Sequence, residues 1–256
     1  MGADAARSEW WYRGLRVLSV VVLLGAWQMF GGQTQAGIDF LPPLSDVVGA
    51  FVDLLGDGAF WSAAADTVKV LVIGYALTVV AGVIIGVVMG SRRTARRAMR
   101  PLVSIALATP IAPLVPILII IFGIGTTARV ATVFILATPI LVENTAASVA
   151  AIPQRLVQMG RSFGASERQL TAKVVIPAAL PGIMAGLRLS AGRAVVGMVV
   201  GELIIASAGL GQLIRTYSAT FDAAPLYATV VAVLLIGLAA VQIVRLVERR
   251  ATRWRP

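Results

Sequence analysis

The chain has 256 residues, of which 58% are hydrophobic and only 13% charged, and its mean hydropathy is +0.89. Soluble domains carry about one quarter charged residues, so this composition predicts an integral membrane protein. The absence of cysteine and histidine excludes a disulfide framework and serine–histidine catalysis, and it removes the commonest metal ligand. The net charge of +10 is not gathered in a basic tail, which argues against nucleic-acid binding.

Six apolar segments are long enough, or nearly so, to cross a bilayer as helices. They are Gly14–Phe30, Ala64–Gly90, Pro101–Ile124, Thr127–Ala150, Ala178–Ile205 and Pro225–Val247. The first is the shortest, and the arginines before it also fit a cleaved signal peptide. We expect it to be retained. The chain is then a single membrane permease domain, with 1–13 and 251–256 as tails around a membrane domain at 14–250.

Basic residues gather at alternate ends of these segments. Clusters lie in the N-terminal tail, between the second and third segments (Arg92, Arg93, Arg96, Arg97, Arg100), between the fourth and fifth, and at the C-terminal end. The loop after the first segment instead carries four aspartates and no basic residue. Lys and Arg favour the cytoplasmic side, so both termini are predicted to be cytoplasmic. A weak helical pattern over Ser45–Leu55 predicts a helix along the outer surface.

Glycine recurs at four-residue spacing in two of the segments. The second carries Gly74, Gly82, Gly86 and Gly90 in register with Thr78, and the fifth carries Gly182/Gly186 and Gly197/Gly201. On a helix this spacing makes one smooth face that allows close helix approach. It predicts tight helix packing, which is compatible with a surface that slides in a moving bundle.

Three prolines and several ionisable groups lie at membrane depth. Pro110, Pro113 and Pro116 predict a bent helix, which either lines a pathway or is bent for structural reasons. Intramembrane charges are costly and are usually paired or face a cavity. For Glu143, Arg188 and Arg193 we favour an ion pair between spans, and the alternative is that Arg193 attracts an anionic substrate. Glu202 either lines the outer entrance or lies in the interface.

The polar stretch "GRSFGASERQLTAKVVIPAALPG" at 160–182 stands between two apolar segments. It is helix-compatible from Pro153, interrupted at Gly164 and closed by Pro177. Its apolar positions form an imperfect amphipathic pattern, which suits either a groove on a soluble partner or a lipid surface. Neither lysine of the chain lies in a Gly-Lys-Ser/Thr motif, so any ATP is bound by another chain.

This stretch resembles the coupling loop of permease subunits of bacterial ATP-binding-cassette (ABC) importers, the binding-protein-dependent inner-membrane component family. That loop reads roughly Glu-Ala-Ala, three residues, Gly, nine residues, Ile-x-Leu-Pro, and here Gln158-Met159-Gly160, Gly164 and Val174-Val175-Ile176-Pro177 keep the spacing. "GRSFGAS", "VVIPAALPGIMAGLRL" and "VVGELIIASAGLGQLI" resemble the sulfonate, taurine and nitrate import branch. Gln158 departs from the pattern by replacing a glutamate.

The resemblance implies an all-helical type I importer fold, with five core spans, an N-terminal one and a cytoplasmic coupling helix. It implies a bacterial inner-membrane complex with a second, identical permease copy, two ATPase subunits that bind ATP and magnesium, and an external substrate-binding protein. This chain itself would hold no cofactor or metal and would perform no covalent catalysis. Gly164 would allow a tight turn, and Pro177 would end the loop.

Residues are expected at two sites, of which the resemblance assigns the first, and the prolines and charges at membrane depth indicate the second. Coupling within loop 153–177 would involve Gln158, Met159, Gly160, Arg161, Phe163, Gly164, Ala165, Val174, Ile176 and Pro177. The translocation pathway is expected near Pro110, Pro113, Glu143, Arg193 and Glu202. A sulfonate-type anion is the leading cargo, with nitrate, bicarbonate and a pyrimidine-type vitamin precursor as alternatives. The rival classes are a stand-alone secondary transporter and a non-transporting membrane scaffold.

Overall fold

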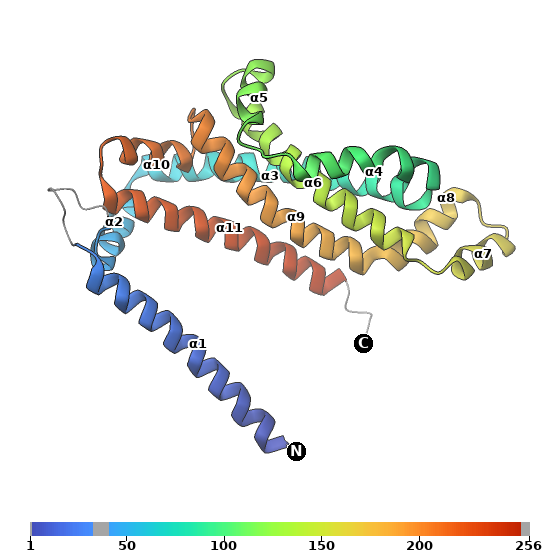
Figure 1. The fold of residues 1–256 in the computed structure, drawn as a ribbon, viewed down its shortest axis with the longest axis horizontal. Coiled ribbons are helices and arrows are strands. Elements are labelled where there is room, and N and C mark those ends of the chain that lie inside the picture. The colour runs from blue at the N-terminus through green and yellow to red at the C-terminus, as the bar shows by residue number, and fades with distance from the viewer. Residues whose placement is uncertain (1, 33–40, 252–256) are drawn as a thin grey trace. The chain divides into compact units, whose positions relative to one another are not determined.

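A computed structural model describes residues 2–32 and 41–251, and every regular element in this part of the chain is a helix. The elements are α1 (Gly2–Phe30), α2 (Leu44–Gly56), α3 (Gly58–Ser91), α4 (Arg93–Ala108), α5 (Leu114–Phe122), α6 (Thr126–Ala150), α7 (Gln154–Ser162), α8 (Glu167–Leu170), the π-helical η1 (Thr171–Val175), α9 (Ile176–Ile205), α10 (Leu210–Ala219) and α11 (Ala223–Ala251) (Figure 1).

Four described helical stretches are long and apolar enough to cross a membrane: Gly58–Ser91, Thr126–Ala150, Glu167–Ile205 and Ala223–Ala251. They confirm the second, fourth, fifth and sixth predicted spans. The first predicted span lies in α1, whose apolar part, Leu18–Phe30, is shorter.

The third predicted span is not one helix, because α4 ends at Ala108 and α5 begins only at Leu114. Pro110 and Pro113 lie in the break, where each removes a backbone donor that a continuous helix would need. Pro113 directly precedes α5, a position at which its missing N–H has no intrahelical partner to lose. The chain is therefore interrupted at this point, which is a sharper change than the predicted bend.

The described residues fall into two compact units, and residues up to Trp61 together with Leu213–Ala232 form the first. Within it the indole N–H of Trp27 donates to the carbonyl of Pro42 at 3.0 Å, and its ring lies 5.9 Å from that of Tyr227. The backbone N–H of Ser45 donates to the Gln28 side chain at 3.0 Å. These contacts fix the start of α2, which confirms the helix predicted over Ser45–Leu55.

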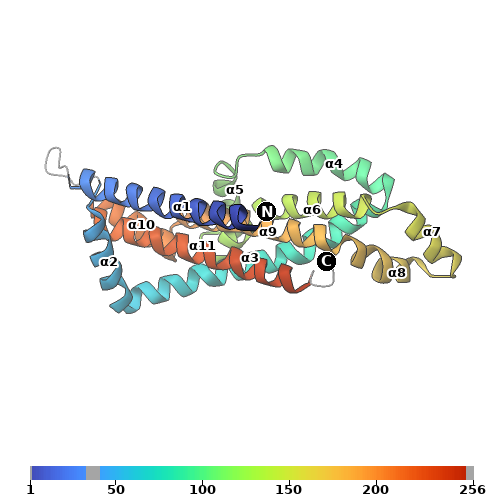
Figure 2. The same cartoon turned by 90° about the horizontal axis from the view of Figure 1, so that it is seen from below.

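The second unit, Ser62–Gln212 with the chain from Val233, is built around α6. A Cβ added at any of the four α3 glycines in the predicted register would lie within 3 Å of an α6 side chain: Gly74 on Val133, Gly82 on Leu141, Gly86 on Thr145 and Gly90 on Val149. The α9 glycines approach α6 in the same way, Gly182 at Ser148 and Gly197 at Val133. Close packing through both glycine faces is confirmed, and Figure 2 shows α6 running alongside α9.

Candidate functional site

The segment that joins α6 to α9 folds as a helical hairpin of α7 and α8, and in both views it extends past the ends of these two long helices (Figures 1 and 2). Helix α7 ends in a Schellman turn: the N–H of Ala165 donates to the carbonyl of Gly160 at 3.2 Å, and that of Gly164 to Arg161 at 2.9 Å. The motif needs a left-handed residue, and Gly164 has φ +75°. The tight turn predicted at Gly164 is confirmed.

Helix α8 begins with a capping box. The Ser166 hydroxyl accepts from the N–H of Gln169 at 3.4 Å, and the Gln169 side chain accepts from the N–H of Ser166 at 2.8 Å. Leu170, which is 2% exposed, packs against Gly160, where an added Cβ would lie 2.5 Å from a Leu170 methyl carbon. An exposed ion pair between Arg161 and Glu167, 3.0 Å long, spans the turn. The hairpin is therefore closed by turn chemistry and one apolar contact, since exposed pairs add little.

The outer face of α7 carries an unusual amount of exposed apolar surface. Leu156, Met159 and Phe163 are 36%, 55% and 85% exposed, at spacings of three and four residues. This spacing places them along one side of a helix. The amphipathic pattern is thus divided: Leu170 closes the hairpin from inside, whereas these three side chains form an outward stripe, here called the α7 stripe.

The hairpin continues into the membrane helix without a break. Residues Glu167–Ile205 form one helical stretch of 39 residues, in which η1 is a π-helical turn closed by the N–H of Ile176 on the carbonyl of Thr171. Pro177 has no N–H for the carbonyl of Lys173, and the wider turn accommodates this loss. Pro177 lies in the first turn of α9, which agrees with the end of the loop predicted there, but the helix passes through it without a break.

The predicted coupling residues divide between the two parts. On the hairpin, Gln158, Met159, Arg161, Phe163 and Gly164 are exposed, and Gly160 and Ala165 are half-buried. The others lie on the helix that follows the hairpin: Val174 is half-buried, and Ile176 and Pro177 are exposed.

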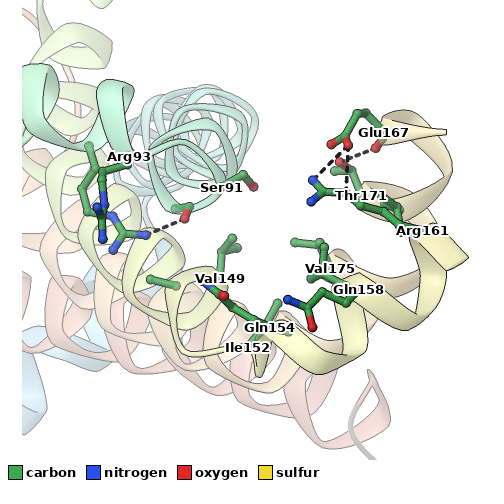
Figure 3. Close-up of a pocket in the computed structure, with 15 residues that line it drawn as sticks. Ser91, Arg93, Val149, Ile152, Gln154, Gln158, Arg161, Glu167, Thr171 and Val175 are labelled. Atoms are coloured by element: carbon green, nitrogen blue, oxygen red, sulfur yellow. Dashed lines mark hydrogen bonds and ion pairs between the residues drawn. The ribbon is translucent and has the colours of Figure 1, made fainter. Parts of the chain in front are cut away.

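A cavity of about 420 Å³ separates the hairpin from the corner where α3 meets α4. Arg93 lines it from the corner, and Gln158, Arg161 and Glu167 line it from the hairpin (Figure 3). Apolar residues such as Val149 and Val175 also line it. The cavity thus has charged side walls of both signs, with arginine on each side.

The charged residues of the membrane helices are only partly paired. Arg188 on α9 lies 3.0 Å from Glu248 on α11, so an ion pair between spans exists, but its carboxylate is not Glu143. Glu143 is half-buried on α6 in a cavity of about 180 Å³ that Arg96 and Arg100 also line. Arg193 is exposed near the middle of α9 and has no carboxylate within ion-pair distance in the described part of the chain.

A buried polar network lies at the opposite end of α9 from the hairpin. Glu202, 1% exposed, accepts from the Thr67 hydroxyl at 2.9 Å and from the N–H of Gly211 at 3.1 Å. Arg129, 2% exposed, lies 2.7 Å from Asp66 and 3.6 Å from Glu202. Glu202 is therefore enclosed by protein groups and is not open to an entrance in this structure.

The contacts among these residues were not predicted from the sequence. Asp66, Arg129 and Glu202 are each more than 60 positions apart, and the pattern of one helix does not say which neighbour it faces. The sequence offers only the glycines at 209 and 211 as a signal; in the structure Gly209 has φ +88°, and a Cβ there would lie 2.5 Å from a Glu202 carboxylate oxygen. The glycines after α9 are therefore needed to let the chain turn over this carboxylate.

Residues 79–253 match the family described as "Binding-protein-dependent transport system inner membrane component". The chain is 32% identical to the riboflavin transport system permease RibX of Chloroflexus aurantiacus, over 97% of this chain and 92% of that protein. It is 26% identical to the taurine permease TauC of Escherichia coli (94% and 89%).

Solved structures share the fold. A chain of an alginate ABC transporter superposes with a TM-score of 0.61 at 13% identity, covering 97% of both chains. A chain of the inward-facing MetNI methionine ABC transporter gives 0.59 at 23% identity, covering 77% of this chain and 97% of that one.

Proposed function

The chain belongs to the binding-protein-dependent transport system inner membrane component family and is a membrane-spanning permease subunit of an ATP-driven ABC importer; from this we propose which residues couple it to its ATPase and which class of solute it carries. It is a multi-pass membrane protein. The family implies partnership with an ATPase and a substrate-binding protein.

We propose that the hairpin 153–170 and the helix that follows it to Pro177 couple the permease to the ATPase. The α7 stripe carries this proposal. Amphipathic helices bind partner grooves through apolar residues spaced like Leu156, Met159 and Phe163, and Phe163, 85% exposed, would otherwise stand in water. Gln158 and Arg161 lie on the cavity side of α7, away from the stripe, and the neutral Gln158 can form a hydrogen bond but no ion pair with a partner there.

We further propose an assembly of two identical permease copies, two ATPases that hold ATP and magnesium, and one external binding protein. Both termini and the hairpin lie in the cytoplasm in this arrangement. The distribution of basic residues supports this orientation, because the α3–α4 corner, the hairpin and the end of α11 are all arginine-rich. The permease itself performs no covalent step, and the whole chain acts as one permease domain.

The proposed cargo is a small anion of the sulfonate type. Arg193 supports this class, because an arginine exposed near the middle of a membrane helix without a carboxylate partner is costly against lipid, by about 3 kcal/mol or more. The position of Arg193 is better explained if this face of α9 lines a water-filled pathway that admits anions. Relatives named for aliphatic sulfonates and taurine belong to the same family, as does one named for a formylaminopyrimidine.

The coupling proposal is tested with Phe163→Ala. We expect this variant to copurify with much less ATPase than the wild-type chain and to lose most ATP-driven uptake, because the most exposed anchor of the α7 stripe is removed. Phe221→Ala is the matched control, since Phe221 is also an exposed phenylalanine, 69% exposed, at a turn outside the hairpin. Equal ATPase recovery from both variants would contradict the role of the stripe.

The cargo proposal is tested with Arg193→Gln in proteoliposomes that contain the full complex. We expect uptake of taurine or an alkanesulfonate to fall at least about tenfold, because one charge-assisted hydrogen bond contributes about 1.5–3 kcal/mol. ATPase copurification should not change, since Arg193 lies outside the hairpin. Undiminished sulfonate uptake would refute an anion contact, and robust uptake of a neutral pyrimidine precursor by both proteins would favour that alternative cargo.

A further inference from the structure

The corner between α3 and α4 is the most basic segment of the described chain. Five arginines occupy nine positions, Arg92 to Arg100, and no Asp or Glu occurs from Thr67 to Val142. Arg96 is used structurally, since its guanidinium donates to the carbonyls of Met89 and Gly90 at the end of α3. The other four are exposed and form no ion pair or side-chain hydrogen bond with the described residues.

The shape of this corner provides a recess for an anion. Arg93 and Arg96 line the 420 Å³ cavity on one side, and Arg161 lines it on the other, with Glu167 as the acidic residue on its wall. Figure 3 shows Arg93 and Arg161 on opposite sides of the open space. Three guanidinium groups against one carboxylate leave the recess cationic, and guanidinium groups suit phosphate geometry.

Beyond Arg100 the same helix becomes apolar and stays exposed. Leu107, which is 45% exposed, lies on the same side of α4 as Arg93 and Arg100, so this side passes within two turns from arginines to surface suited to acyl chains, whereas Leu102 and Ile105, 65% and 62% exposed, lie on the opposite side. Basic groups at the cytoplasmic end of membrane helices attract anionic headgroups, and basic pockets between such helices bind them.

We propose that this recess and the arginines of α4 form a binding site for the headgroup of an anionic phospholipid, with its acyl chains along the apolar part of α4. The inference rests on the proposed orientation, which places the corner at the cytoplasmic surface. An acidic protein surface fits less well, because the α4 arginines lead toward exposed apolar residues and Arg93 lies across a recess from the hairpin. The lipid touches the walls that carry Gln158 and Arg161, so lipid composition tunes coupling.

The test uses the full-length chain purified from membranes into nanodiscs of phosphatidylcholine with or without phosphatidylglycerol. Native mass spectrometry counts the phosphatidylglycerol molecules that stay bound. Each arginine in contact with the bound anionic headgroup contributes about fivefold to retention, so Arg93→Gln with Arg97→Gln should reduce retention roughly 25-fold. The control, Arg249→Gln with Arg250→Gln, removes the same charge from the exposed end of α11 and should retain lipid as the wild type does.

Three results would overturn the proposal. Equal retention in the two double variants would show that the corner selects no lipid. Displacement of the lipid from the wild-type chain by soluble glycerol phosphate would identify a free-anion site. Loss of ATPase copurification in Arg93→Gln/Arg97→Gln with unchanged lipid retention would identify a protein partner. Lipid retention is measured without ATP or transport. A failure of the lipid proposal can therefore be distinguished from a failure of the coupling proposal.

Discussion

Replacing Gly164 tests the geometry of the coupling hairpin most directly. Gly164 has φ +75°, and a Cβ built on it meets no atom within 4 Å. Alanine therefore creates no clash, and its whole effect is the backbone strain of a left-handed residue, about 1–2 kcal/mol. If the strain is relieved by opening the hairpin alone, the open population rises by about 5- to 30-fold.

Limited trypsin digestion can measure this opening, because Arg161, Arg168 and Lys173 are cleavage sites on the hairpin and the turn after it. Gly164→Ala should be cut several-fold faster than the wild-type chain at these bonds, and ATP-driven uptake should fall in parallel. Gly164→Val should be worse, since a β-branched residue tolerates positive φ poorly. Gly164→Asn should lie close to the wild type, because asparagine enters this region readily.

Gly49→Ala is the matched control. Gly49 lies inside helix α2, its Cβ would also meet no atom within 4 Å, and its φ is not positive, so alanine should be neutral or slightly stabilising there. Equal cleavage rates for Gly164→Ala, Gly164→Asn and the wild type would refute the reasoning, because they would mean that the hairpin does not depend on a left-handed residue at this turn.

Two further pairs of substitutions test the packing of the membrane helices. Arg129→Met should lower the free energy of unfolding by about 3–5 kcal/mol, because it removes the cation beside the buried Glu202 and the partly buried Asp66. Arg188→Met, which removes a guanidinium that is 38% exposed, should cost about 1 kcal/mol or less. Thermal unfolding in detergent compares them, and equal losses would contradict the network. Gly86→Val should lower Tm, because a Cβ at Gly86 would lie 2.5 Å from an α6 side chain. The control, Gly25→Val, should leave Tm unchanged, because a Cβ at Gly25 meets no atom within 4 Å. Similar Tm values for the two variants would argue against close packing of α3 on α6.

Local patterns in the sequence predicted those features that local chemistry determines. The four-residue glycine spacing specified the packing faces of α3 and α9, since helix geometry alone brings such residues to one side. Likewise the interruption predicted at Gly164 is where α7 ends, and the capping box of Ser166 and Gln169, which was not predicted, is an equally local signal for the start of α8. For these elements the neighbouring residues carry the information, and the structure agrees with the prediction.

The features that were missed depend on contacts between distant segments, or on whether a helix can continue in spite of a lost hydrogen bond. Arg188 could have paired with Glu143 or with Glu248. The way in which α9 and α11 face each other decides that it pairs with Glu248. Pro177 reads as a helix end, but a proline costs one hydrogen bond, and a single π turn absorbs that loss while the apolar helix on either side continues. Sequence alone does not weigh one lost bond against the packing of a whole span.

The π turn that was not predicted also explains how the hairpin can act on the membrane. Since α8, η1 and α9 form one helix, a force on the α7 stripe reaches α9 through Leu170 and Gly160 without crossing a flexible linker. Along its length α9 contacts α6 through glycine faces, on which helices can slide because few side chains interlock. At its far end Glu202 is fixed by several hydrogen bonds, so movement driven at the hairpin is expected to pivot α9 about this network.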